Sequence, residues 1–257
     1  MRDQGLSEAI QAVGGVSELA RRVGISQPSV SNWDKVPAER VLAVEAATGI
    51  ARMRLRPDLY REPPVSQVDD VDLARSREYA LLAALLSRAP DADLLARLSR
   101  LGGDASPLGL AHVSLGEAAS STEATAVERE YFNLFIGLGR GELLPYASYY
   151  LTGFLNERPL ARLRDDLAVL GVERVEGNYE PEDHAATLCE IMAGLAGGTL
   201  PAPKGAERRL FEKHMAPWIG RFFADLERAE AANVYRHVGT VGRVFVEIEA
   251  EAFALPS

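Results

Sequence analysis

The stretch VYRHVGTVGRVFVEI, residues 234–248, decides the fold class. Apolar side chains recur in it every three or four residues, at Val234, Val238, Val241, Phe245 and Ile248. That spacing places them on one face of an α-helix, whereas a strand would alternate apolar and polar residues. The stretch therefore predicts an amphipathic helix whose apolar stripe faces a core.

The same helical period recurs earlier in the chain. Two sets of leucines follow it: Leu81, Leu82, Leu85 and Leu86, and then Leu160, Leu163, Leu167 and Leu170. No long run alternates apolar and polar residues with turn signals at hairpin spacing. The sequence predicts an all-α protein, with a small N-terminal helix-turn-helix bundle linked to a larger all-helical domain.

Composition narrows the class of protein further. Apolar residues make up 47% of the 257 residues and charged residues 25%, which is typical of a globular protein. The single cysteine, Cys189, excludes an intrachain disulfide and fits a reducing compartment. The N-terminus has no continuous apolar segment, and no stretch approaches eighteen uninterrupted apolar residues. We expect a cytoplasmic protein without a membrane partner.

A break in the helical period divides the chain. The stretch REPPVSQVDDVD, residues 61–72, predicts a linker between a domain at 1–60 and a larger domain at 73–257. Residues 1–62 hold nine Lys and Arg against eight Asp and Glu, a net charge of +1, so the rest of the chain carries −10 and the whole chain −9. An acidic body is a poor general binder of nucleic acid.

The N-terminal domain shows the pattern of a helix-turn-helix. Gly14–Gly15 end a first helix, and Gly24, which tolerates a positive φ, ends a second. Ser26 is a good N-cap for a third helix that starts at Gln27–Pro28. Two short helices joined by a three-residue, glycine-led turn match the motif.

In that motif the start of the second of the two helices meets base edges. The candidate DNA contacts are Gln27, Ser29, Ser31 and Asn32 for bases and Arg21 and Arg22 for phosphates. The stretch GGVSELARRVGISQPSVSNWDKVPAERVLAVEAATGI, followed by LRPDLY, resembles the Cro/YdaS-like helix-turn-helix family. The resemblance implies DNA binding, or else use of the domain as a scaffold or dimerisation module, which would make the protein a homodimer.

The larger domain lacks the signatures of common enzymes. It contains no glycine loop with lysine, no His-Glu-x-x-His and no Gly-x-Ser-x-Gly. The histidines show no spacing typical of metal ligands, and Cys189 lies off the face of His184. We predict no catalytic residue, no metal and no cofactor, and therefore a protein that is not an enzyme.

The stretch NYEPEDHAATL, residues 178–188, packs three acids and a histidine together. Pro181 suits a first helical position, and Glu182 and Asp183 would then lie in the first turn, where the helix dipole favours negative charge. His184 would follow the apolar stripe toward Leu188, as a hydrogen-bonded core residue more often than as a catalyst. We expect a helix start here.

A second dense stretch is EYFNLFIGLGRGELLPYASYY, residues 130–150. On a helix, four of its side chains form an apolar face: Tyr131, Leu134, Phe135 and Leu138. After Pro145, tyrosines crowd a loop or a helix start. Such tyrosines suit recognition of an extended peptide, because each offers a ring and a hydroxyl.

The blocks YFNLFIGLG, PYASYY, EPEDH and FEKHMAPWIGRFFADL together resemble the TorD/DmsD family of molybdoenzyme chaperones. The resemblance implies an all-helical cytoplasmic protein that binds the twin-arginine signal peptide or the apo form of a molybdopterin oxidoreductase, with formate dehydrogenase as a candidate client, and assists cofactor insertion before export. It also implies client-binding residues: Tyr131, Phe135, Tyr146, Ser148, Tyr149, Glu180, Asp183 and His184.

The implied site is physically reasonable. A signal peptide joins two arginines to an apolar segment, and an acidic groove lined by rings offers carboxylates for the first and apolar surface for the second. The N-terminal domain departs from the family pattern. It leaves open a DNA-binding regulator whose larger domain senses the client protein or peptide.

Overall fold

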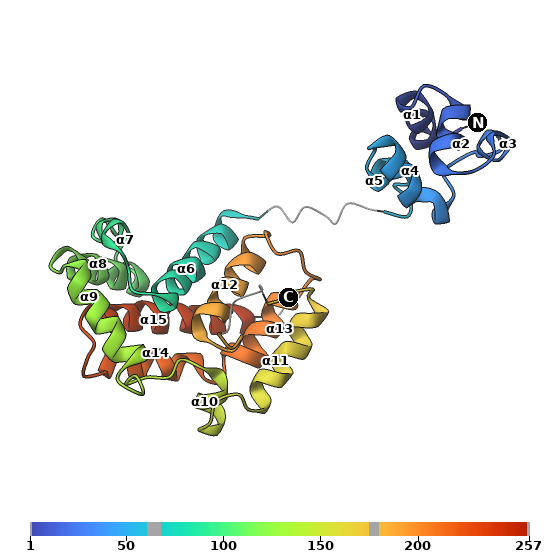
Figure 1. The fold of residues 1–257 in the computed structure, drawn as a ribbon. Coiled ribbons are helices and arrows are strands. Elements are labelled where there is room, and N and C mark those ends of the chain that lie inside the picture. The colour runs from blue at the N-terminus through green and yellow to red at the C-terminus, as the bar shows by residue number, and fades with distance from the viewer. Residues whose placement is uncertain (1, 61–67, 175–179, 256–257) are drawn as a thin grey trace. The chain divides into compact units, whose positions relative to one another are not determined.

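The computed structural model describes residues 2–60, 68–174 and 180–255, and it divides into two compact units, Met1–Gln67 and Val68–Ser257. Within the described residues both units are helical, and the only pairing of β type is an isolated antiparallel bridge between Tyr146 and His184. The predicted all-α fold class is confirmed (Figure 1).

Between residues 2 and 60, the described part of the N-terminal unit, the chain forms five α-helices and a short 3₁₀ turn. They are α1 (Gln4–Ala12), α2 (Val16–Val23), α3 (Gln27–Ser31), η1 (Ala38–Arg40), α4 (Val41–Thr48) and α5 (Arg52–Leu55). Their core holds Leu6, Leu19, Val30, Val44 and Leu55, each fully buried. Burial of these side chains is what holds helices of four to nine residues, which are too short to be stable alone.

The turn between α2 and α3 has the expected geometry. Gly24 adopts φ 75°, in the left-handed region that favours glycine, and Ile25 packs against the core of the unit. Ser26 occupies the N-cap position of α3, but its Oγ lies 2.7 Å from the Oγ of Ser29 and makes no bond to a backbone N–H. The cap is therefore one of backbone geometry alone.

In the larger unit the described residues form ten α-helices and two π-helical turns. They are α6 (Asp70–Ser87), α7 (Ala92–Leu98), α8 (Pro107–Ser120), α9 (Ala124–Tyr131), η2 (Phe132–Ile136), α10 (Ala147–Thr152), α11 (Arg158–Val169), α12 (Ala185–Ala196), α13 (Ala206–Leu210), η3 (Phe211–Met215), α14 (Ile219–Arg228) and α15 (Val234–Ala254). Long α15 packs on α14 and α8, and α12 packs along α6 (Figure 1). These contacts enclose one apolar core that includes Trp218, Phe222, Phe223 and Tyr235.

The boundary between the units falls where the composition changes. Residues 61–67 of the expected linker lie outside the described residues, and its residues 70–72 form the first turn of α6. Asp69 caps that turn, because its carboxylate accepts from the Asp72 N–H at 2.8 Å. None of the helices in the described part of the chain is both long and apolar enough to cross a membrane.

The prediction that Ile248 and Leu138 belong to apolar faces packed on the core is wrong. Ile248 is 44% exposed, and the buried residue at this level of α15 is its neighbour Glu249. The carboxylate of Glu249 is bound by Arg75 at 2.6 Å and by the hydroxyl of Tyr79 at 2.8 Å, so α6 supplies the partners that a buried charge requires. Leu138 is 98% exposed because Gly137, at φ 63°, ends the helical segment before it.

Candidate functional site

The two motif segments of the larger unit lie side by side. The Ala147 N–H donates to the Asp183 carbonyl at 3.0 Å, and the Ala185 N–H donates to the Pro145 carbonyl at 2.8 Å. These bonds form the bridge that pairs Tyr146 with His184. Residues more than thirty positions apart in the sequence therefore meet at the starts of α10 and α12.

Asp183 fastens this junction from inside. Its Oδ2 accepts from the Ser148 N–H at 2.7 Å, in the first turn of α10, and both residues are fully buried. Asp183 Oδ1 and Ser148 Oγ are buried without a hydrogen-bond partner among the described residues. Buried side chains cannot touch a ligand on the surface, so both residues support the site from beneath.

His184 is the N-cap of α12, which begins at Ala185. The expected helix start at Pro181 is wrong, because residues 181–184 form a turn and the bridge to Tyr146 instead. His184 Nδ1 accepts from the Ala186 N–H at 3.0 Å, and the ring is 7% exposed. Burial lowers the pKa of His184 although Glu180 and Asp183 act to raise it, so the imidazole is neutral and able to accept.

Glu182, which we expected in the first turn of a helix, forms ion pairs instead. Its carboxylate pairs with Arg164 and Arg174, each at 2.9 Å. The two arginines come from α11 and from the segment that follows it. Glu182 therefore ties the turn to α11.

Tyr146, Glu180 and His184 form a connected cluster. The hydroxyl of Tyr146 donates to Glu180 Oε1 at 2.5 Å, and its ring meets that of His184 edge to face at 5.0 Å. Burial, with help from Glu180, raises the pKa of Tyr146 and takes that of Tyr131 to about 12, so both hydroxyls remain protonated donors. The hydroxyl of Tyr131 donates to the Leu86 carbonyl at the end of α6.

An open groove lies beside this cluster, between α6 and α12. It has a volume of about 560 Å³ and is lined by Tyr131, Glu180, His184, Ala80, Ala83, Ala84, Ser87, Ala186, Thr187, Glu190 and Ala193. Three of the eight predicted client-binding residues line it, namely Tyr131, Glu180 and His184. The alanines of α6 and Glu190 of α12 were missed, because periodicity identifies the faces of a helix but not the face that borders a hollow.

The remaining predicted residues lie apart from the groove lining. Phe135 packs edge to face against Tyr131 at 5.0 Å. Tyr149 is covered by the guanidinium of Arg140, whose Nη2 donates to its hydroxyl at 3.0 Å. Neither residue lines the groove, so the structure brings only part of the predicted set together.

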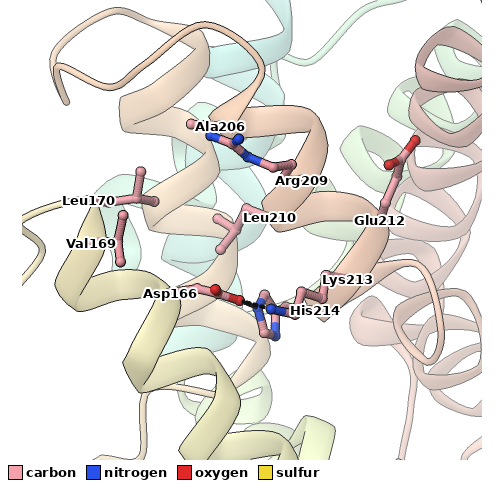
Figure 2. Close-up of a pocket in the computed structure, with 9 residues that line it drawn as sticks. All are labelled: Asp166, Val169, Leu170, Ala206, Arg209, Leu210, Glu212, Lys213 and His214. Atoms are coloured by element: carbon pink, nitrogen blue, oxygen red, sulfur yellow. Dashed lines mark hydrogen bonds and ion pairs between the residues drawn. The ribbon is translucent and has the colours of Figure 1, made fainter.

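A second pocket, of about 540 Å³, lies between α11 and the segment α13–η3 (Figure 2). Its floor is apolar, with Leu170 and Leu210, and its rim carries Asp166 bound by Lys213 at 2.5 Å and by His214 at 2.6 Å. None of the predicted residues lines it. The carboxylate of Asp166 is thus engaged by two neighbours, while Arg209 and Glu212 add one charge of each sign to the lining.

Two features bear on the chemistry of the described residues, namely possible metal ligands and the single cysteine. No three His, Cys, Asp or Glu side chains gather there as metal ligands. Cys189 is fully buried on α12, and burial raises the pKa of its thiol to about 12, so it has no nucleophilic character.

The predicted DNA contacts occupy the surface of the N-terminal unit. Gln27, Ser29 and Asn32 are exposed, and Ser31, which is half-buried, accepts from Gln27 Nε2 at 2.7 Å. Arg21 and Arg22 are both ion-paired with Glu18 on α2.

Fold and site together define a two-unit helical protein whose larger unit joins two distant motif segments beside an acidic groove. Residues 102–224 match the family described as nitrate reductase delta subunit, and residues 6–64 match the family described as bacterial toxin YdaS.

Relatives fall into the same two groups. Chaperone protein TorD of Vibrio cholerae is 27% identical over 127 residues, which cover 46% of this chain and 58% of that protein. Chaperone protein TorD of Shewanella loihica is 25% identical over 217 residues, or 74% of this chain and 98% of that protein. YdaS of Escherichia coli, named provisionally as a transcriptional regulator, is 45% identical over 58 residues, or 20% of this chain and 59% of that protein.

A crystal structure from Archaeoglobus fulgidus, described provisionally as a redox enzyme maturation protein, covers 66% of this chain and 93% of its own, with 22% identity and a TM-score of 0.48. The family matches and relatives confirm both predicted resemblances. The larger unit is similar to the TorD chaperones, and the N-terminal unit is similar to YdaS.

Proposed function

We propose that this protein is a cytoplasmic maturation chaperone for a molybdopterin oxidoreductase, with formate dehydrogenase as a candidate client. It binds the twin-arginine signal peptide or the apo form of the client and assists cofactor insertion before export. The observation that carries the proposal is the groove between α6 and α12, where Tyr131, Glu180 and His184 meet in a TorD-family domain.

The groove has the features that such a client requires. Alanine methyl groups line much of it, and the ring of Tyr131 adds apolar surface with a polar tip. Glu180 and Glu190 supply negative charge for the arginines of a signal peptide. Ser148 and Asp183 act indirectly in this proposal, because they hold the starts of α10 and α12 together.

A groove-filling substitution tests the proposal. Ala80 is exposed on α6 and lines the groove, so Ala80→Leu should occupy the space without disturbing the core. We expect the Kd for a twin-arginine peptide, measured by isothermal titration calorimetry, to rise about tenfold or more, which corresponds to about 1.4 kcal/mol. Ala126→Leu, at an exposed site of α9, is the matched control and should bind as the unaltered protein does. Equal binding by both variants would contradict the assigned groove.

A second candidate function is DNA binding by the YdaS-like unit, which the likeness to YdaS and the exposed Gln27, Ser29 and Asn32 favour. Glu18 weakens the case for DNA binding, because its carboxylate is ion-paired with Arg21 at 2.6 Å and with Arg22 at 2.9 Å. These two arginines could otherwise contact DNA phosphates and release their counterions. We propose that Glu18→Gln frees both arginines.

The change should raise DNA affinity and steepen its salt dependence in an anisotropy titration, since each added phosphate contact adds about 0.9 to the slope of log K against log salt. Glu39→Gln removes one charge at another exposed site of the same unit and is the control. Selection of sites from random DNA by the unaltered protein tests sequence specificity. No enrichment, together with no effect of Glu18→Gln, would remove this candidate.

A further inference from the structure

The groove between α6 and α12 has an unbalanced charge. Two carboxylates, Glu180 and Glu190, line it, and none of its described lining residues is a lysine or an arginine. His184 also lines the groove, but it is buried and its ring accepts a backbone hydrogen bond, which requires the neutral form of the imidazole. A ligand that enters this groove therefore meets a negative rim with no competing cation.

Glu190 is one of the two carboxylates of that rim. It lies on the exposed side of α12, and together with Glu180 and Thr187 it also lines a second hollow of about 590 Å³ on the α11 side of the helix. Glu190 thus faces the open space on both sides of α12. It forms no hydrogen bond or ion pair with any described residue, so its carboxylate is available to a partner.

The cations of the neighbouring hollow are already engaged. Arg164 and Arg174 line it, and both are bound to Glu182 at 2.9 Å. They therefore leave the charge of Glu190 uncompensated. A cation from outside the described part of the molecule is the group that would balance it.

Much of the groove lining beside Glu190 is apolar. The side chains of Ala80, Ala83 and Ala84 on α6 face those of Ala186 and Ala193 on α12. Because each is a single methyl group, the backbone or an apolar side chain of a bound segment can approach both helices closely. A carboxylate above a methyl-lined floor suits a segment in which a basic residue lies beside apolar ones.

We infer that Glu190 is the residue that pairs with an arginine of the client peptide, while the alanine floor takes the apolar side chains next to that arginine. The inference rests on the proposed function and adds to it a specificity-determining residue. An arginine is favoured over a lysine, because its planar guanidinium binds a carboxylate through two parallel hydrogen bonds.

The test is a double-mutant cycle on the full chain. The probe is a synthetic peptide in which two consecutive arginines precede an apolar segment. Two variant peptides each have one of the arginines replaced by glutamine. Glu190→Gln should raise the Kd for the twin-arginine peptide about three- to fivefold at low salt, the range for an exposed ion pair. The effect should shrink at high salt and with the peptide that lacks the paired arginine.

Glu128→Gln is the matched control, because Glu128 is exposed on α9 and lines none of the hollows described above. It makes the same change in net charge, so it separates a local pairing from a general loss of attraction. If Glu190→Gln and Glu128→Gln bind the peptide equally well, the inference is overturned and the proposed function stands. If the unaltered protein fails to bind the peptide, the inference and the signal-peptide part of the proposed function are both overturned.

Discussion

Protonation of His184 would remove the hydrogen bond with which its ring caps α12. Its Nδ1 must be unprotonated to accept the Ala186 N–H that starts α12, and burial lowers the pKa of the ring. An unfolded chain would bind a proton near the ordinary value of 6.5. The stability that comes from His184 is therefore present above about pH 6.5 and lost as the pH falls below it.

We predict that His184→Asn flattens this pH dependence, because asparagine keeps a capping acceptor that does not titrate. Between about pH 7.5 and 5.5 the unaltered protein should lose up to about 1.4 kcal/mol more of its unfolding free energy than the variant, the linkage for one pH unit below 6.5. Urea unfolding at both pH values measures the difference. His112, whose pKa is raised by Glu78, acts in the opposite direction in both proteins and cancels. Parallel losses in the two proteins would refute the role of His184.

For single residues, the sequence predicts which side chains lie near the site better than it predicts what each of them contacts. Tyr131, Glu180 and His184 could be found because their motif blocks can be read from the chain. The burial of Asp183 could not, because it depends on the Ser148 N–H from another segment. Glu190 had no signal either, since an exposed glutamate on a helix is ordinary until the hollow beside it is known.

The start of α15 is held by a carboxylate from a distant element. Glu130, at the end of α9 and only 8% exposed, accepts from the backbone N–H groups of Asn233 at 2.7 Å, Val234 at 3.2 Å and Tyr235 at 2.7 Å. These are groups that the first turn of α15 leaves without partners inside the helix. The negative charge also lies at the positive end of the helix dipole.

We predict that Glu130→Gln lowers the free energy of unfolding by about 2 to 3 kcal/mol. An amide offers one oxygen where the carboxylate offers two, and its NH₂ group would face backbone donors in a buried site. Chemical denaturation followed by circular dichroism measures the loss. Glu128→Gln, two residues earlier and exposed, should change stability by less than about 0.5 kcal/mol. A similar small change for both variants would show that Glu130 is not needed to start α15.

Element by element, the sequence predicts the helices well and their ends poorly. Periodicity located α15, but the capping by Glu130 and the burial of Glu249 depend on α9 and α6, which lie more than a hundred residues away. Pro181 suggested a start for α12, yet the bridge between Tyr146 and His184 takes those residues out of the helix. Non-local partners of this kind leave no local pattern.

The whole molecule consists of two units with separate hydrophobic cores. The core of the N-terminal unit, from Leu6 to Leu55, and that of the larger unit, from Tyr79 to Val246, have no residue in common. The groove and the junction beneath it belong entirely to the larger unit. Folding and peptide binding by the larger unit should therefore not require the YdaS-like unit.

We predict that a chain of residues 68–257 folds and binds the twin-arginine peptide with a Kd within about twofold of that of the full chain. Calorimetry should show two transitions for the full chain and one for the shortened chain, at the temperature of one of the two. The larger unit has the larger core, so its transition is expected at the higher temperature. Loss of helicity, or peptide binding weakened more than tenfold on removal of the N-terminal unit, would mean that the two units work as one body and that the YdaS-like unit takes part in holding the client.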